Sequence, residues 1–320
     1  MNYLDKLRES AKETGSIACM GLDPVVDAMP AYVKGMDARG IPNFIEKIFE
    51  EMTKQKVFPG AFKPNQGFYV MHDRSRAGDF SGSQALSAVM NMIEDMFPGI
   101  PVILDYKRGD IATSSANYAA EGFESWRADA VTVAPYMGTD SVSPFAKYCN
   151  KEQGKGIYVL DRTSNPGARG LQNLEVALDT NTLVKEMIGE SDIGKTTMPL
   201  YEAVAHKIME WSADNPGVGA VIGATSPGEL GNILAVINGY EQPQIPLLIP
   251  GVGSQGGTAP EVMAKLRESS YELPLVRINS SSGITHPWVK KKEPAPADFA
   301  KVCVEKLAEL NEQTGYRKSA

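Results

Sequence analysis

Residues 101–115 read PVILDYKRGDIATSS, and this stretch decides the fold of the chain. Pro101–Asp105 is an apolar run of strand length, and charged side chains follow it directly. Alternation along a strand predicts that Ile103, Asp105 and Lys107 point to one side and the residues between them to the other. Short runs that are apolar on both sides are typical of buried parallel strands.

Seven further runs of this kind recur along the chain, separated by stretches with helical periodicity, such as the apolar face over residues 86–97. The runs are Ser16–Met20, Gly60–Lys63, Ala130–Ala134, Gly156–Leu160, Gly219–Gly223, Pro246–Ile249 and Leu273–Ile278. Eight strand–helix units in series favour an α/β fold, a (β/α)8 TIM barrel formed as a single domain by residues 1–320. A doubly wound open sheet is the alternative, because periodicity alone does not show that a sheet closes.

Two connections are longer than the usual two to six residues or so of such folds. The stretch Ser164–Met198 predicts an enlarged loop after the fifth strand, part of it a lid or an inserted helix. His286–Asp298 carries three consecutive lysines at 290–292 and is interpreted as a solvated linker into the last helix.

Composition narrows the class of protein. The 320 residues carry 39 acidic and 32 basic side chains, a net charge of −7, which argues against a nucleic-acid-binding protein. No apolar run approaches the roughly 20 residues that cross a bilayer, and the N-terminus lacks the apolar segment of a signal peptide. Cys19, Cys149 and Cys303 show no metal-type or redox-type spacing. We therefore expect a cytoplasmic protein without membrane or nucleic-acid partners.

Charged residues gather where two neighbouring strands end. Lys63 ends the second predicted strand and Asn65 follows it, while Asp105 and Lys107 lie at the end of the third. A lysine beside a carboxylate lowers the pKa of the carboxyl group and stays charged itself. Such an array suits a reaction in which charge leaves one ligand atom and a proton arrives at another. Asp110 lies beyond the strand, so it must reach in from its loop or serve a neighbouring subunit.

A glycine-rich loop, PGVGSQGGTAPE at 250–261, follows the seventh predicted strand and leads into a helix near Thr258. Backbone N–H groups in such loops hold phosphate, and barrels commonly bind phosphate after strands seven and eight. The alternative interpretation is a flexible tight turn.

Five motifs carry a resemblance to a known family. They are GLDP (21–24), FKPNQ (62–66), LDYKRGDI (104–111), RTSNPGA (162–168) and PGVGSQGG (250–257). In this order they resemble orotidine 5′-phosphate decarboxylases, most closely the longer-chain bacterial subgroup. The resemblance implies a TIM barrel, a carboxy-lyase that converts the nucleotide orotidine 5′-monophosphate (orotidylate) to UMP and CO2 in de novo pyrimidine biosynthesis, no metal or other cofactor, and a homodimer with shared sites.

The same resemblance implies roles for individual residues. Lys63, Asp105, Lys107 and Asp110 match the catalytic tetrad of the family. Lys107 would protonate C6 of the pyrimidine, Asp105 and the Asp110 of a partner subunit would lie against the substrate carboxylate, and Lys63 would bind a ribose hydroxyl. The substrate-binding positions it implies are Asp23 and Asn65 for the sugar, Ile111 and Ser164 around the base, Gln255, Gly256 and Gly257 at the phosphate, and Ser114. Ser114 stands where the family usually has threonine.

One departure concerns the phosphate. In RINSSSGI (277–284), Ser282 stands where the subgroup has an arginine that binds phosphate. Either another cation substitutes, such as Arg277, Arg169 or a lysine, or backbone groups and hydroxyls hold the phosphate alone. Two alternative functions remain open: a Mg²⁺-dependent sugar-phosphate lyase or decarboxylase on the same barrel, and a non-catalytic nucleotide-binding barrel.

Overall fold

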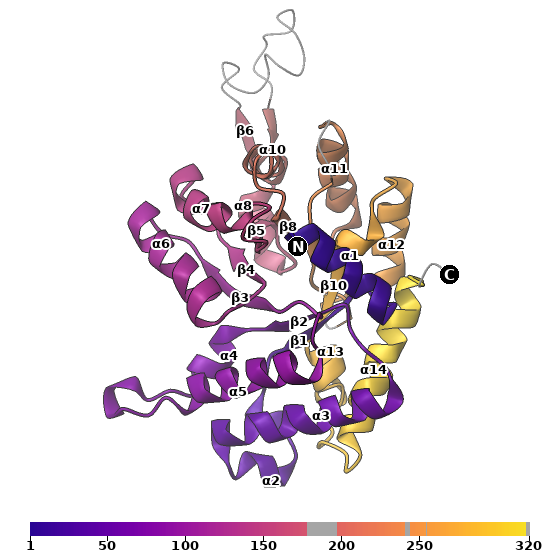
Figure 1. Cartoon of the computed structure of the whole chain (residues 1–320). Helices are drawn as coiled ribbons and strands as arrows, with labels where there is room; N and C mark the ends of the chain where they lie inside the picture. The colour runs from indigo at the N-terminus through magenta and orange to yellow at the C-terminus, as the bar shows by residue number, and fades with distance from the viewer. Residues whose placement is uncertain (178–196, 241–243, 254, 318–320) are drawn as a thin grey trace, which may run out of the picture.

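A sheet of eight parallel strands forms the centre of the computed structural model, which describes residues 1–177, 197–240, 244–253 and 255–317 (Figure 1). The strands run in the order β2-β1-β10-β9-β8-β5-β4-β3. Their bounds are β1 (Ala18–Leu22), β2 (Ala61–Pro64), β3 (Ile103–Arg108), β4 (Ala130–Val133), β5 (Gly156–Arg162), β8 (Val218–Ile222), β9 (Leu247–Ile249) and β10 (Val276–Ser280). All eight predicted strands are therefore confirmed, although several extend further into polar residues than their apolar runs.

The two ends of this sheet, β2 and β3, meet through isolated parallel bridges. Phe62 pairs with Val102, and Asn65 pairs with Asp105. The Phe62 N–H donates to the carbonyl of Pro101 at 3.0 Å. The sheet therefore closes into a (β/α)8 barrel, which confirms the TIM barrel against the open doubly wound sheet.

Side chains alternate between the barrel interior and the surrounding helices. Ile103 packs in an interior cluster with Ala130 and Tyr158, whereas Leu104 packs on the helix side. The N-terminal helix α1 (Tyr3–Thr14) lies near the amino ends of the strands, and the hydroxyls of Tyr3 and Tyr158 are 3.0 Å apart. A Cβ on Gly156 would lie 2.4 Å from the Tyr3 ring, so glycine is required where this helix approaches β5.

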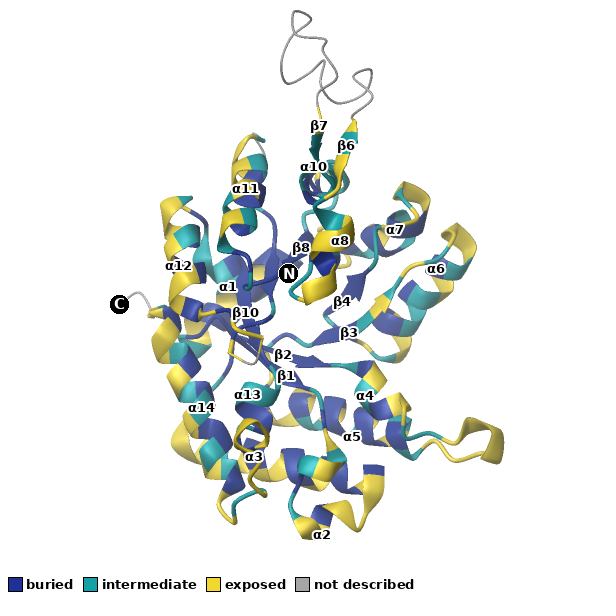
Figure 2. Cartoon of the chain, turned by 180° about the vertical axis from the view of Figure 1, so that it is seen from behind, coloured by how far each residue is buried: buried dark blue, intermediate teal, exposed yellow. Residues whose placement is uncertain are grey.

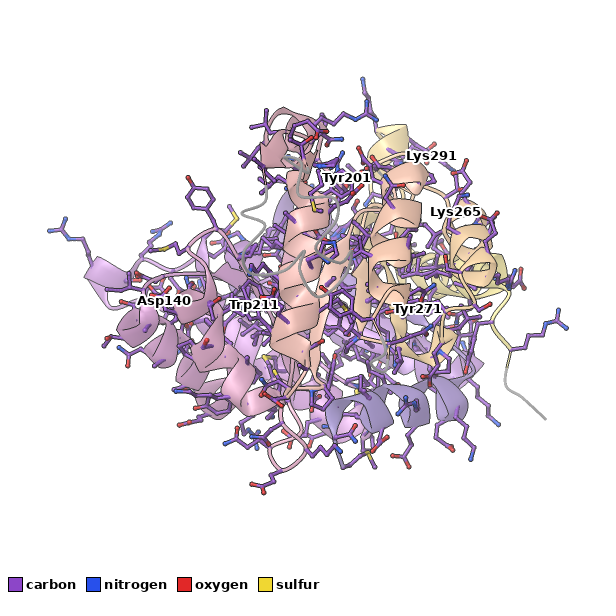
Figure 3. All side chains as sticks on the ribbon, turned by 90° about the horizontal axis from the view of Figure 1, so that it is seen from above. Asp140, Tyr201, Trp211, Lys265, Tyr271 and Lys291 are labelled. Atoms are coloured by element: carbon purple, nitrogen blue, oxygen red, sulfur yellow. The ribbon has the colours of Figure 1, made fainter. Side chains whose placement is uncertain are left out.

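Helices surround the barrel and bury one face each, while their outer faces are exposed (Figure 2). The longer ones are α3 (Ile41–Gln55), α5 (Ser81–Met96), α6 (Ala112–Ala120), α7 (Thr139–Ala146), α10 (Leu200–Ser212), α11 (Pro227–Asn238), α12 (Ala259–Glu268) and α14 (Phe299–Thr314). Trp211 of α10 faces α7, where its indole N–H donates to the Thr139 hydroxyl at 3.1 Å (Figure 3). Among the described residues, no helix is long and apolar enough to span a membrane.

The connection after β5 is enlarged, as its length predicts. It contains the short helix α8 (Arg169–Gln172) and an antiparallel pair formed by β6 (Glu175–Ala177) and β7 (Thr197–Pro199). The described part of this connection thus holds one helical turn and a short pair of strands. Residues 178–196, on which the expectation of a lid depends, lie outside the described residues.

Candidate active site

A cavity of about 690 Å³ opens at the carboxyl ends of the barrel strands. Seven of the predicted site residues line it: Asp23, Lys63, Asn65, Asp105, Lys107, Ser164 and Gln255. Five do not: Asp110, Ile111, Ser114, Gly256 and Gly257. Sequence reasoning missed several polar residues of the lining, namely Thr132 on β4, Thr163 and Asn165 after β5, and Asn279, Ser280 and Ser281 at the end of β10. The rule that barrel sites form at strand ends could have selected the last three.

The charged centre of the cavity is a carboxylate held between two ammonium groups. Lys63 Nζ lies 2.6 Å from Asp105 Oδ2, and both side chains are buried. Lys107 Nζ forms an ion pair with the other oxygen, Oδ1, and is half exposed. Burial alone would raise the pKa of Asp105, but the charges of Lys63 and Lys107 outweigh it and hold that pKa well below its usual range. Burial likewise opposes the charge on Lys63, yet Asp105 and Asp23 raise the pKa of its ammonium group.

Asp23, on the segment after β1, extends this alternation of charge. Burial raises the pKa of its carboxyl group, and the nearby Lys63 ammonium partly offsets that shift. Its Oδ1 is buried without a hydrogen-bond partner among the described residues. Gly21 in the same motif allows β10 to approach, since a Cβ there would lie 1.9 Å from the Ser281 hydroxyl oxygen. A buried carboxylate oxygen without a partner is a group that a ligand hydroxyl would satisfy.

Regular strand alternation does not explain how the side chain of Lys107 comes to lie beside Asp105. The register of β3 against β4 shifts between Leu104 and Arg108, and Lys107 has a φ of 48°. A lysine in this left-handed region costs about 1–2 kcal/mol relative to extended backbone. The prediction that Lys107 and Asp105 meet is confirmed, but a bulge in the strand, rather than a regular strand, brings them together.

Asp110 and its neighbours do not line the cavity of their own chain. Asp110 Oδ1 accepts a hydrogen bond from the Ile111 N–H at 2.7 Å, and Ser115 Oγ donates to the Asp110 carbonyl at 2.8 Å. The Ile111 side chain is 56% exposed. These contacts place the loop after β3 on the rim of the barrel, consistent with the expectation that strand geometry keeps Asp110 off the face that carries Asp105.

Ser164 is held between the ends of two neighbouring strands. A Cβ on Gly223 would lie 2.7 Å from the backbone of Ser164, and one on Gly251 would lie 2.8 Å from its side chain. The Thr225 hydroxyl donates to the Ser164 carbonyl at 3.1 Å. Glycines at the ends of β8 and β9 therefore make the space that this serine occupies in the cavity wall.

The described residues of the glycine loop after β9 have a defined backbone geometry. Gly251, Gly253 and Gly256 all have positive φ, and the Gly253 N–H donates to the carbonyl of Gly257 at 2.9 Å. Thr258 then caps α12, where its hydroxyl accepts from the Glu261 N–H. The loop thus has the left-handed glycines and the adjoining helix start that an anion-binding cradle requires.

Among the candidate phosphate cations, Arg277 is ruled out by its position. It is fully buried at the start of β10 and donates to four carbonyl groups, including those of Leu7 and Gly60. Lys290, by contrast, donates from Nζ to the Gly253 carbonyl at 2.8 Å. Arg169 is exposed and lines a hollow together with Ser164 and Gln255. Arg169 and a lysine, Lys290, therefore remain as candidate phosphate-binding cations near the glycine loop.

The ion pairs of the cavity already engage the carboxylate of Asp105, which would otherwise be a possible metal ligand. Within the parts of the chain that the structure describes, no group of three or more His, Cys, Asp or Glu side chains is arranged to hold a metal ion. Cys19, Cys149 and Cys303 are buried free thiols, and burial raises the pKa of Cys19 to about 12.

The fold and this cavity together define a (β/α)8-barrel protein with a charged small-molecule site at the carboxyl ends of its strands. The model of the orotidine 5′-phosphate decarboxylase / HUMPS family matches residues 79–269, and the chain belongs to that family. It is 38% identical over 288 residues to the orotidine 5′-phosphate decarboxylase of Variovorax paradoxus, covering 89% of this chain and 90% of that protein.

Solved structures agree with this assignment. The OMP decarboxylase of Leishmania donovani is 30% identical with a TM-score of 0.68, and the similarity covers 98% of this chain and 99% of that one. The UMP synthase of the same organism is 30% identical with a TM-score of 0.67, and the similarity covers 97% of this chain. The chain spans 57% of the length of that UMP synthase.

The Asp105 ion pairs predict a pH-dependent contribution to stability. Asp105→Asn leaves the buried Lys63 without its counter-charge, so we expect the free energy of unfolding at pH 7 to fall by about 3 kcal/mol. Because the folded-state pKa of Asp105 is lowered, its stabilisation is present above about pH 4 and is lost as the pH falls through the folded-state pKa. The difference between wild type and Asp105→Asn should therefore narrow below about pH 4.

Urea unfolding measured across that pH range checks the prediction. Asp5→Asn is the control, because it removes an exposed pair with Arg8 and should change stability little at any pH. An equal loss for both variants, or a difference that widens on acidification, would contradict the assignment.

Proposed function

We propose that this protein is a carboxy-lyase that converts orotidine 5′-monophosphate to UMP and CO2 in de novo pyrimidine biosynthesis, without a metal or other cofactor. The observation that carries the proposal is the Lys63–Asp105–Lys107 array inside the barrel cavity. The names of the relatives described above support it. We further propose that residues 1–320 act as one barrel domain, and that the protein works in the cytoplasm, where its buried thiols stay reduced.

The array suits this reaction for electrostatic reasons. Loss of CO2 breaks the bond between C6 and the carboxyl carbon and leaves the electron pair on C6. Lys107 Nζ donates the proton that forms the new C6–H bond, and solvent then returns a proton to the lysine. The fixed negative charge of Asp105 would lie beside the carboxylate of the bound substrate and repel it. This repulsion is relieved as CO2 departs, which favours the transition state over the bound substrate.

The remaining cavity residues would bind the parts of the nucleotide that do not react. Lys63, Asp23 and Asn65 would bind the ribose hydroxyls, and Ser164 would hydrogen-bond the base. Gln255 and the glycine loop, including Gly256 and Gly257, would hold the phosphate.

The geometry gives less support to the hypothesis of a Mg²⁺-dependent lyase. A divalent cation needs free carboxylate oxygens. Asp105 Oδ2 is bonded to Lys63, while Oδ1 is bonded to Lys107 and to the Thr132 hydroxyl. If the protein were a non-catalytic nucleotide-binding barrel, the free-energy cost of burying this charge array would bring no gain in reaction rate.

Lys107→Ala tests the function directly. Removing a general acid costs about 100- to 10,000-fold in rate, so we expect kcat for orotidylate to fall by at least about a hundredfold. UMP formation is the measurement, and Lys147→Ala, which removes an exposed lysine from the protein surface, is the control. Turnover by Lys107→Ala near the wild-type rate would refute the mechanism, and loss of wild-type activity on chelation would favour the metal-dependent alternative.

A homodimer would place a second Asp110 at each site. Large apolar side chains are exposed on the segments after β2, β3 and β4, at the rim of the cavity. They are Val70, Met71, Phe80, Ile111, Tyr136 and Met137. An apolar rim of this kind suits a self-complementary interface between two copies of this chain. In that dimer Asp110, Ile111 and Ser114, which do not line the cavity of their own chain, would complete the site of the partner.

Mixed dimers test this sharing. Asp110→Ala and Lys107→Ala proteins are each expected to be inactive, while their mixture should regain up to about one quarter of the wild-type activity per site by forming one intact site in each hybrid. UMP formation is measured after subunit exchange, which is verified with differently tagged chains. Exchange without recovered activity would show that Asp110 acts within its own chain.

Lys290 is our candidate for the phosphate cation. It is already bonded to the glycine loop through Gly253, and it lines a hollow together with Ser282, the residue at the position of the expected arginine. Ser282 also lines the active-site cavity, so the two spaces adjoin. A lysine brings a point charge to phosphate, whereas an arginine would bind it in a bidentate manner.

Lys290→Ala should raise the KM for orotidylate by about tenfold, the cost of one charge-assisted hydrogen bond, with a smaller change in kcat. Arg169→Ala is the matched variant, since Arg169 is an exposed cation that lines a hollow together with Gln255 of the loop. Steady-state kinetics on both proteins decide between them. A raised KM in Arg169→Ala with a normal KM in Lys290→Ala would reverse the assignment.

A further inference from the structure

Three residues of β3 stand opposite a single residue of β4. Leu104 pairs with Val131 and Arg108 pairs with Val133, so that residues 105–107 all face Thr132. A bulge of this kind removes ladder hydrogen bonds from the bulged strand. The backbone N–H groups of the bulge therefore need other acceptors, since buried donors without partners are costly.

The hydroxyl group of Thr132 supplies those acceptors. Its Oγ1 accepts from the Tyr106 N–H at 3.1 Å and from the Lys107 N–H at 2.9 Å. The same hydroxyl donates to Asp105 Oδ1 at 3.0 Å. A hydroxyl has one donor and two acceptor sites, so all of its capacity is used on these three consecutive residues.

Thr132 is also placed so that its contacts persist. Its side chain is 1% exposed, and it sits on a central strand of the barrel with β3 on one side and β5 on the other. Branching at Cβ restricts the χ1 angle of a threonine, which limits where its hydroxyl points. Water has little access to compete for the three hydrogen bonds.

We infer that Thr132 is a positioning residue for the decarboxylation: its hydroxyl holds the left-handed backbone of Lys107 and the carboxylate of Asp105 in the arrangement that the reaction uses. The inference rests on the function proposed above. Thr132 acts on the proton donor and on the charge beside the reacting bond, not on the groups expected to bind ribose or phosphate. Its loss should therefore reduce kcat far more than it raises KM.

Thr132→Val keeps the shape of the side chain and removes the hydroxyl. We expect kcat to fall by about ten- to a hundredfold, the range for losing a hydrogen bond to a charged group, while KM changes by less than about threefold. Thr132→Ser keeps the hydroxyl and should recover kcat to within about threefold of wild type. If Thr132→Val does not fold, Thr132→Ala is the second variant without a hydroxyl and carries the same expectation.

A matched control separates positioning from general loss of stability. Thr314 is equally buried, and its hydroxyl donates to the Asn311 carbonyl and accepts from the Tyr316 N–H, far along the chain from the site. Thr314→Val should keep the wild-type kcat even where it lowers the free energy of unfolding. Amide hydrogen exchange of a peptide covering residues 103–108 should become faster in Thr132→Val and not in Thr314→Val.

The outcomes distinguish this inference from the proposed function. A wild-type kcat in Thr132→Val beside an inactive Lys107→Ala would overturn the positioning role and leave the function intact. Equal impairment of Thr132→Ser and Thr132→Val would also overturn it, because side-chain packing and not the hydroxyl would then matter. Activity in Lys107→Ala would instead count against the proposed mechanism itself.

Discussion

The ion pair between Lys63 and Asp105 is the interaction on which the remainder of the site depends. It joins β2 to β3, where the barrel closes through isolated bridges instead of a continuous ladder. Desolvating two charges costs several kcal/mol for each ion, and only a close pair with further hydrogen bonds repays that cost. Lys107 and Thr132 provide those further bonds to Asp105. The charged centre therefore lies at the junction where the barrel closes.

The sequence was sufficient to predict the barrel and seven of the residues that line its cavity. Eight apolar runs identified the strands, and the rule that sites form at strand ends identified Lys63, Asp105 and Lys107. Alternation correctly predicted that Lys107 lies on the same side as Asp105, but for the wrong reason. It assumes that each residue stands opposite one residue of the next strand, whereas the strand bulges at this point. Thr132 was missed for the same reason: nothing in its one-dimensional neighbourhood shows that three residues of another strand face it.

Depth along a strand was the other quantity that the sequence did not show. Arg277 lies five residues before Ser282 and looks like a substitute for a missing cation. At a rise of about 3.3 Å per strand residue, however, it sits well below the barrel mouth. There it donates to the carbonyl groups of Leu7 in α1, of Gly60 just before β2, and of Pro274 and Val276 around the start of β10. An arginine near a phosphate motif in sequence can thus be a structural residue, because the length of a single strand separates the base of the barrel from its mouth.

The charges lining the cavity bear on how the proposed substrate binds. Asp23 and Asp105 balance Lys63 and Lys107, so these four groups offer no net attraction to an anionic nucleotide, and the chain as a whole carries −7. Attraction must come from the glycine loop and from a cation beside it. Binding energy gained at the phosphate would then hold the substrate carboxylate against Asp105, a contact that is unfavourable until CO2 departs. An array with no net charge serves this purpose better than a positive one, because a positive site would stabilise the carboxylate that the reaction has to remove.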